Sequence, residues 1–344
     1  MLKKFLITIF SIIASVLLFL AGIALYHNTH LKKEREILSP IGQFIEVDGH
    51  NMNLYIEDAD DSEHTLVFLA GTGTPSPIYD FKPLYSLLTD RYRVVVIEKF
   101  GYGYSDEVEG ERTLDVITEQ DREALSLAGI EAPYILVPHS SGGIEAIFWA
   151  NNYPSEVEAI VGLDINVPEQ YDYYAQGTSI DDMTPQDIND AVNSMAVYDF
   201  LMYKVGLMRL LMNPDSTLPA LLSDALTREE KNQYRALAYT MYSEGSGATW
   251  ARETIMTAHQ LQLYREYVHG PIPDVPTLLL VSDGSMMAPV FGSDYTSIWR
   301  QIHRNYIDLI SNGDIIELDC GHYLHAERPE EVSAAMISFI ESLP

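Results

Sequence analysis

The stretch that most constrains the fold of this chain is YILVPHSSGG, at residues 134–143. Its first residues form an apolar run typical of a buried strand, and the residues after its two glycines have the spacing of a helix. When a strand turns directly into a helix, the residue at the turn is exposed at the edge of the sheet, and its neighbours must be small. The stretch therefore predicts that Ser140 or Ser141 is presented as a nucleophile.

Ser140 is the better candidate of the two serines. It alone has His139 directly before it and Gly142 two residues after it. Pro138 stands where such a turn usually has a glycine, so the entry to the turn is stiffer and bulkier than usual. The alternative interpretation is a serine-rich loop between a strand and a helix, without a catalytic role.

Short apolar runs alternate with helical patterns along most of the chain. The predicted strands are Phe44–Val47, Met52–Glu57, Thr65–Leu69, Tyr92–Ile97, Tyr134–Val137, Ala159–Leu163, Thr277–Val281 and Ile315–Leu318. The predicted helices are Phe81–Thr89, Thr113–Ala128, Gly143–Asn152 and Glu330–Leu343. This alternation predicts an α/β fold with a mostly parallel central sheet covered by helices on both faces.

The alternation stops in the middle of the chain. Residues 165–270 contain helical patterns and no clear strand, and Tyr198–Met212 reads as one apolar, Met-rich helix. We therefore expect a helical cap at 165–270, inserted over the edge of the sheet where α/β folds bind ligands. The α/β core is then divided between residues 40–164 and 271–344.

An uncharged apolar run, Phe5–Tyr26, precedes the core and is long enough to span a bilayer. A cleaved signal peptide and a buried core helix are the alternatives, but the run is longer than a signal region and ends in a poor cleavage site. Lysines and arginines flank it almost equally, so they fix its orientation only weakly. We expect residues 1–36 to be a single-pass anchor in the cell membrane, with the catalytic body on the extracytoplasmic side.

The charge of the chain is divided in the same way. Residues 1–36 carry a net charge of +3 and residues 37–344 carry −32, which together give the total of −29. A body this acidic has little with which to bind a phosphate backbone, so nucleic acid is excluded as a partner. A single cysteine, Cys320, excludes a disulfide framework.

Four stretches match a known family in order and spacing. They are the glycine loop after Thr65–Leu69, the run Gly101-x-Gly103-x-Ser105-Asp106, residues 139–143 and Gly321-His322. Together they resemble the α/β-hydrolase superfamily over about residues 40–344. The resemblance implies a nucleophile elbow at Ser140 and a catalytic triad, in which His322 takes the serine proton and a carboxylate orients His322. His325 is the local competitor of His322.

The resemblance leaves two candidates for the triad acid. Asp283 follows the penultimate strand, where most members carry the acid, but Ser285 occupies the usual position in that loop. Asp164 ends the strand after the nucleophile helix, 24 residues beyond Ser140, where some members carry it. We prefer Asp164 and keep Asp283 as the alternative.

The loop Leu69–Pro75 stands where the family carries its oxyanion loop, with Ala70 in place of the usual histidine. By position, the backbone N–H groups of Thr72 and Ser141 are expected to form the oxyanion hole. A dinucleotide-binding loop is the weaker interpretation, because the third glycine is missing. Neither a metal nor an organic cofactor is expected, since no HExxH or CxxC spacing occurs.

These features predict a serine hydrolase that cleaves an ester or amide acyl bond of a small-molecule substrate through an acyl-enzyme. The alternatives are an aminopeptidase similar to proline iminopeptidases, an acyltransferase, and a non-catalytic binding module on the same scaffold. Serine rather than aspartate at position 140 argues against the chemistry of haloalkane dehalogenases and epoxide hydrolases, which the family also contains.

Overall fold

The structure is a computed structural model of the whole chain. It describes residues 1–59, 62–110, 112–170, 200–211, 213–244, 272–285 and 295–344. Much of the predicted cap, at 171–199 and 245–271, lies outside the described residues.

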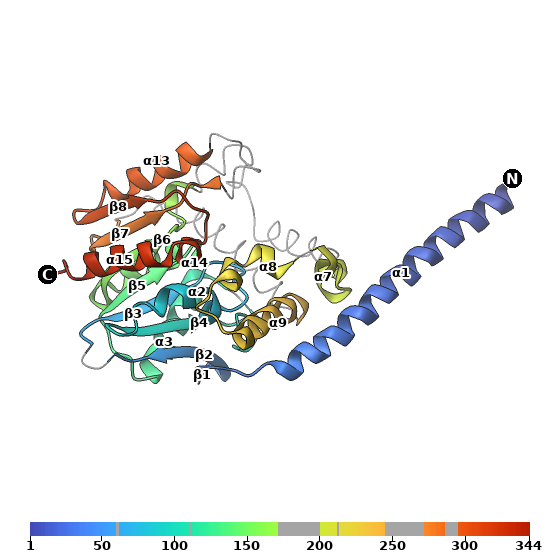
Figure 1. Cartoon of the computed structure of the whole chain (residues 1–344), viewed down its shortest axis with the longest axis horizontal. Helices are drawn as coiled ribbons and strands as arrows, with labels where there is room; N and C mark the ends of the chain where they lie inside the picture. Colours follow the sequence, from blue (N-terminus) through green and yellow to red (C-terminus); the bar gives the residue numbers. More distant parts are fainter. Residues whose placement is uncertain (60–61, 111, 171–199, 212, 245–271, 286–294) are drawn as a thin grey trace.

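A single eight-stranded sheet forms the centre of the molecule (Figure 1). Its strands, in sheet order, are β1 (Gln43–Val47), β2 (His50–Glu57), β4 (Arg93–Glu98), β3 (Thr65–Leu69), β5 (Tyr134–Pro138), β6 (Val157–Leu163), β7 (Thr277–Val281) and β8 (Gly313–Glu317). β2 is antiparallel to both of its neighbours, and the strands from β4 to β8 are parallel. The mostly parallel α/β fold predicted from the alternating pattern is therefore confirmed.

Helices cover both faces of the sheet, because its central strands are apolar on both sides. One face packs against α2 (Pro77–Tyr85), α14 (Leu324–Glu327) and α15 (Pro329–Ile340). The other packs against α3 (Leu114–Leu127), α4 (Gly142–Asn152) and α13 (Tyr295–Ile307). Alternate residues of β7 show the division, since Leu278 faces the first layer and Leu279 faces the second.

The described part of the cap consists of short elements and one long helix. They are η3 (Phe200–Lys204, a π-helical turn), α7 (Leu207–Leu211), α8 (Pro214–Thr217), η4 (Pro219–Leu222) and α9 (Arg228–Glu244). The prediction of one continuous helix over Tyr198–Met212 is wrong. Gly206 adopts a φ of +89°, a left-handed conformation that interrupts a helix, so η3 and α7 are separate.

Other helices also differ from the sequence prediction. α2 begins at Pro77 rather than Phe81, since proline is favoured in the first turn of a helix. The helix α13, which the sequence analysis did not identify, connects β7 to β8.

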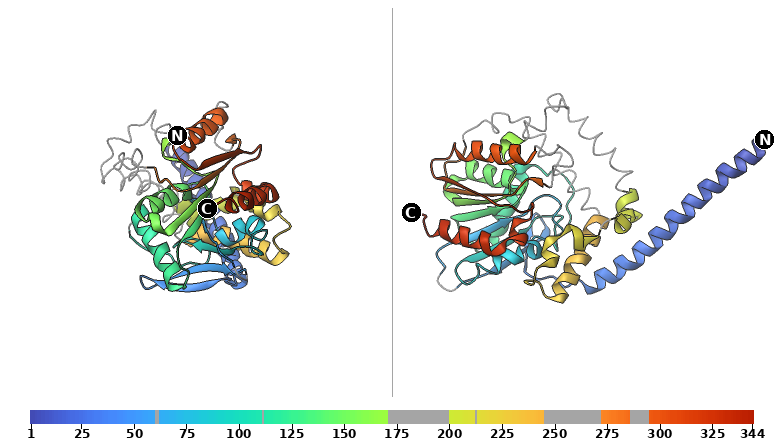
Figure 2. Two further views of the ribbon diagram at one scale, coloured as in Figure 1. Left: turned by 90° about the vertical axis from the view of Figure 1, so that its left-hand side faces the viewer. Right: turned by 45° about the horizontal axis from the view of Figure 1, so that its top comes forward.

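The N-terminal helix α1 (Leu2–Ile37) extends away from the sheet, and the cap helices α7 and α9 lie on the side of the body that faces it (Figures 1 and 2). Within the described residues, α1 is the one helix long and apolar enough to cross a membrane. Its most apolar window has a mean hydropathy of 2.7 and is 6% buried.

Candidate active site

Five loops meet at the C-terminal edge of the sheet, because β3, β5, β6, β7 and β8 are parallel neighbours in that order. The residues that leave these strands are, in the same order, Thr72, Ser140, Asp164, Ser282 and His322. This is the edge at which parallel α/β sheets bind ligands. The fold therefore brings the residues selected from the sequence to one place, although they lie far apart along the chain.

Ser140 occupies the turn between β5 and α4 with a φ of +53°, which is uncommon for a residue other than glycine. Its N–H donates to the carbonyl oxygen of Leu163 over 3.3 Å, and its own carbonyl accepts from the N–H of Asn166 over 2.8 Å. The turn is thus held in a strained conformation by β6 and the loop that follows it.

Glycines allow the neighbouring loops to approach the turn closely. A Cβ atom added at Gly71 would lie 2.6 Å from the Ser140 Cβ, and one added at Gly142 would lie 2.7 Å from the carbonyl oxygen of Leu69. Both distances are shorter than side chains tolerate, so these positions require glycine. Pro138, the unusual residue at the entry, is the last residue of β5 and stays in register with Leu69 of β3.

Asp164 and His322 form a close polar pair beside this turn. His322 Nδ1 lies 2.6 Å from Asp164 Oδ2. The Asp164 side chain is 1% exposed, whereas that of His322 is 13% exposed. The pair therefore joins a buried carboxylate to an imidazole that solvent can still reach.

Three further hydrogen bonds fix the Asp164 carboxylate. Oδ1 accepts from the Ser282 N–H over 2.7 Å and from Trp299 Nε1–H over 2.8 Å, and Oδ2 accepts from the Ser282 hydroxyl over 2.7 Å. Burial alone would raise the pKa of Asp164. The His322 hydrogen bond and the charges of His322 and His303 outweigh it, so the pKa of Asp164 is lowered from its ordinary value of 3.8.

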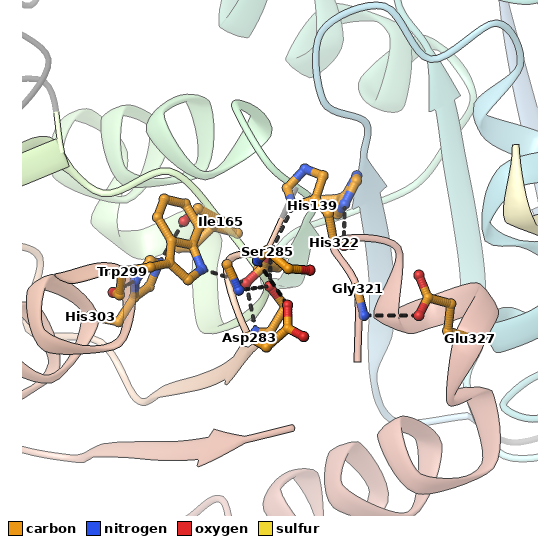
Figure 3. A network of polar contacts seen from close by, with 12 residues as sticks. His139, Ile165, Asp283, Ser285, Trp299, His303, Gly321, His322 and Glu327 are labelled. Atoms are coloured by element: carbon orange, nitrogen blue, oxygen red, sulfur yellow. Dashed lines mark hydrogen bonds and ion pairs between the residues drawn. The ribbon is translucent and has the colours of Figure 1, made fainter. Parts of the chain in front are cut away.

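Asp283, the alternative acid, has a different environment. Its Oδ1 accepts from the Ser285 N–H over 2.8 Å, and its own N–H donates to the carbonyl oxygen of Cys320 over 3.1 Å (Figure 3). This is the hydrogen-bonding pattern of a turn-forming aspartate. The described geometry brings Asp164, and not Asp283, to His322.

The loop that carries His322 is tied down at two points. The Gly321 N–H donates to Glu327 Oε2 over 2.8 Å, and His139 Nε2 lies 3.1 Å from the His322 carbonyl oxygen (Figure 3). A carbonyl oxygen can only accept, so Nε2 of His139 carries the hydrogen. The rings of His139 and His322 are also in contact, with centroids 4.6 Å apart.

His325, the competitor of His322, belongs to a buried polar cluster with Asp80 and Tyr234. Its Nε2 lies 2.9 Å from Asp80 Oδ2, and both side chains are 0% exposed. The Tyr234 hydroxyl donates to the other Asp80 oxygen over 2.7 Å. Asp80, His139 and His325 each offer one atom within 4.8 Å of the others, a spacing that a metal ion could bridge. The Asp80 carboxylate, however, already accepts from two side chains.

The expected oxyanion donors have unequal surroundings. The Thr72 N–H donates to the Ser141 hydroxyl over 2.7 Å, and the Thr72 hydroxyl lies 2.6 Å from the same oxygen. The Ser141 N–H has no acceptor among the described residues. A hydroxyl oxygen thus occupies the position at which the Thr72 N–H points.

Sequence reasoning missed the supports of the pair, Trp299 and His303 above all. His303 Nδ1 lies 2.7 Å from the carbonyl oxygen of Trp299, and His303 Nε2 lies 2.7 Å from that of Ile165 (Figure 3). Trp299 is 135 residues from Asp164 in the chain, so no local pattern connects them. The only available signal was the amphipathic spacing of α13.

Comparison with known proteins shows the family of this chain. Residues 66–335 match the sequence model of the alpha/beta hydrolase family. An uncharacterized protein of Bacillus subtilis, YbdG, is 31% identical over 340 residues, which cover 97% of this chain and 96% of that protein.

Solved structures share the fold at low identity. An epoxide hydrolase from Bacillus megaterium superposes with a TM-score of 0.64 at 18% identity, covering 87% of this chain and 100% of that one. A haloalkane dehalogenase variant from Bradyrhizobium elkanii superposes with a TM-score of 0.60 at 19% identity, covering 88% and 96%. With the family match over residues 66–335 and the elbow geometry at Ser140, the chain belongs to the alpha/beta hydrolase family of enzymes.

Proposed function

We propose that this protein is a membrane-anchored serine hydrolase in which Ser140, His322 and Asp164 form the catalytic triad. The observation that carries the proposal is the 2.6 Å contact between His322 Nδ1 and Asp164, next to a serine held at a φ of +53°. The low pKa of Asp164 supports its role, because an ionised acid fixes the imidazole tautomer and stabilises the imidazolium.

In the proposed reaction Ser140 Oγ attacks an acyl carbonyl carbon while His322 Nε2 takes the hydroxyl proton. The tetrahedral intermediate collapses when His322 returns this proton to the leaving alcohol or amine, and an acyl-enzyme remains. Water then attacks the acyl carbon, again with His322 as base, and releases the carboxylic acid together with free Ser140. Asp164 keeps its charge throughout.

The Thr72 and Ser141 N–H groups are the proposed oxyanion donors. In the structure the Ser141 hydroxyl accepts from the Thr72 N–H, so a substrate oxyanion would take over this hydrogen bond. One such donor stabilises the transition state by about 3 kcal/mol. The Ser141 hydroxyl then serves as a polar partner that keeps the loop in place when no substrate is bound.

The anchor is the second part of the proposal. The apolar side chains of α1 are exposed on all sides over Phe5–Val16, as with Phe10 at 74% and Ile12 at 59%. A helix of this kind is stable in hydrocarbon and costly in water. We infer a single-pass helix in the cell membrane, with the acidic body on the extracytoplasmic side. Extraction with alkaline carbonate tests the anchor. Labelling of intact cells with an impermeant thiol reagent tests its orientation, using a variant with a cysteine introduced at the exposed Leu309, because the native Cys320 is buried.

A fluorophosphonate probe tests the catalytic part, because it reacts with activated serines. We expect labelling of the wild type, loss of labelling in Ser140→Ala, and strong slowing in His322→Ala. Labelling that survives Ser140→Ala would contradict the proposal. A panel of p-nitrophenyl acyl esters and amino-terminal proline amides, each with and without an added alcohol, then separates esterase, aminopeptidase and acyltransferase activity.

A further inference from the structure

The C-terminal third of α1 is not free, but packs against the cap. Ile23, His27 and Leu31 are buried, at 6%, 3% and 5% exposure, and their spacing of four residues places them on one face of the helix. This face contacts the cap helix α9 (Arg228–Glu244) and the turn at Gly206. A Cβ atom added at Gly206 would lie 2.3 Å from His27 Cγ, so only a glycine admits this approach.

Arg209 of α7 holds the same face through polar contacts. Its two terminal nitrogens each donate to one carboxylate oxygen of Glu34 over 2.6 Å, and its Nε–H donates to His27 Nδ1 over 3.0 Å. The Arg209 side chain is 6% exposed and that of Glu34 is 16% exposed. Paired, largely buried contacts of this kind fix orientation, because Arg and carboxylate match in geometry.

Ile23 lies inside the apolar run Phe5–Tyr26, within its last turn. His27, which lies against the turn at Gly206, directly follows this run, so the cap contacts the helix at the depth where the run leaves the hydrocarbon. The cap is thus attached directly at the boundary between the apolar and polar parts of the bilayer.

The cap segment next to this contact, residues 200–211, is itself apolar at its surface. Phe200 is 58% exposed, Leu210 is 54% exposed and Leu211 is 72% exposed. This segment contains no acidic residue, and its exposed cation is Lys204, because Arg209 is buried in its pair with Glu34, whereas residues 37–344 as a whole carry −32. Exposed apolar side chains with cations and without acids are typical of a surface that lies on a membrane.

We propose that residues 200–211 of the cap form a second membrane contact, in which Phe200, Leu210 and Leu211 insert into the headgroup region of the bilayer that holds α1. The partner is the phospholipid surface, identified by the depth of His27, the exposed apolar side chains and the absence of acidic residues from this segment. This inference rests on the proposed anchor. The Arg209–Glu34 pair keeps the segment against α1, so that the cap stays at the membrane surface.

Depth-dependent fluorescence quenching of the full-length protein tests this surface. Single cysteines at Ile12, Leu211 and Leu309 are labelled with an environment-sensitive dye, in vesicles of phosphatidylcholine and phosphatidylglycerol that contain lipids with a shallow spin label. Cys320 is buried, and burial raises its pKa to about 12, so a thiol reagent selects the introduced cysteines. Leu309 is 66% exposed, similar to Leu211 at 72%, and serves as the matched control on the body.

We expect the dyes at positions 12 and 211 to be quenched at least about twofold more than the dye at position 309. Quenching at 12 with equal signals at 211 and 309 would overturn the cap contact and leave the anchor intact. No quenching at 12 would overturn the anchor, and with it the basis of this inference. Arg209→Ala should reduce quenching at 211 but not at 12, whereas the control Arg235→Ala, which removes the pair with Asp215, should change neither.

Discussion

Two Asp–His pairs lie at the same end of the molecule and differ in what surrounds them. Asp164–His322 joins β6 to the loop after β8, with 2.6 Å between its atoms and an imidazole that is 13% exposed. Asp80–His325 joins α2 to α14, with 2.9 Å between its atoms and both side chains 0% exposed. The two histidines are three residues apart in the sequence GHYLH.

In each pair one ring nitrogen of the histidine contacts the aspartate, so the role of the histidine depends on what its second ring nitrogen can contact. His325 Nδ1 is buried and has no hydrogen-bond partner among the described residues, and its ring packs against Phe81 with centroids 4.9 Å apart. His322 lies at the edge of the sheet with Ser140. The first arrangement suits a role in stability and the second suits proton transfer.

Replacing His322 and His325 in turn by leucine tests this comparison with the largest expected effects. We expect His322→Leu to lower kcat/KM by about four orders of magnitude, because Ser140 then lacks its base. Stability should change little, since Asp164 keeps its bonds to Ser282 and Trp299. Steady-state ester hydrolysis and denaturant unfolding measure the two effects.

His325→Leu should give the opposite result. It leaves a buried Asp80 oxygen without its donor, which should cost about 2–4 kcal/mol of unfolding free energy. The rate per folded molecule should stay within about threefold of the wild type. A large loss of activity in folded His325→Leu would contradict the division of roles between the pairs.

Replacing Asp164 and Asp283 in turn by asparagine tests which of the two carboxylates is the triad acid. Asp164→Asn should lower kcat by about 10⁴-fold, because the amide favours the wrong imidazole tautomer. Asp283→Asn should leave kcat within about twofold, because an asparagine oxygen can still accept from the Ser285 N–H. Rates for both variants, normalised by active-site titration, decide between the acids, and equal losses would refute the choice of Asp164.

The ring of His139 contacts the histidine of each pair, His322 and His325. Burial, with the charges of His322 and His325, lowers its pKa well below 6.5, so the folded protein holds it neutral. Below about pH 6.5 the unfolded chain binds a proton that the folded chain does not, so stability falls as the pH falls. The contribution is at most about 1.4 kcal/mol per pH unit.

The wild type should therefore lose more stability than His139→Gln between about pH 7 and about pH 5. The unfolding free energy of the wild type must be compared with that of His139→Gln at each pH, because Glu98 changes the stability of both proteins in the opposite direction. Burial raises the pKa of Glu98 to about 7, so the folded protein binds a proton there that the unfolded chain has already lost, and stability falls as the pH rises towards 7. Urea unfolding at several pH values measures the difference, and parallel curves for the two proteins would contradict a neutral His139.

The smallest expected effect concerns the Ser141 hydroxyl. Ser141→Ala keeps the backbone N–H and removes the oxygen that accepts from Thr72. We expect kcat to change by about threefold or less, because the substrate oxyanion replaces this oxygen in the proposed mechanism. Progress curves with an activated ester measure the rate. A loss as large as that of Ser140→Ala would show that Ser141 is the nucleophile.

The sequence predicted the core of the fold because buried strands and the strand–turn–helix around Ser140 leave local patterns. It did not predict α13 as an element, nor that Trp299 donates to Asp164, since that contact depends on how α13 packs on β7. The break at Gly206 was missed because the apolar pattern of Tyr198–Met212 outweighed one glycine, whose left-handed φ and close approach to His27 are tertiary features. Asp164 and Asp283 were both candidates in the sequence, and they differ only through tertiary contacts.

Locating a trapped adduct tests the central claim, that Ser140 is activated by the His322–Asp164 pair. The full-length protein in detergent is treated with a fluorophosphonate, digested and sequenced by mass spectrometry, beside the Asp164→Asn and Asp283→Asn variants. We predict one phosphonyl group per chain on Ser140 in the wild type and in Asp283→Asn, and strongly slowed modification in Asp164→Asn. An adduct on Ser141, or modification at the wild-type rate in Asp164→Asn, would contradict the claim.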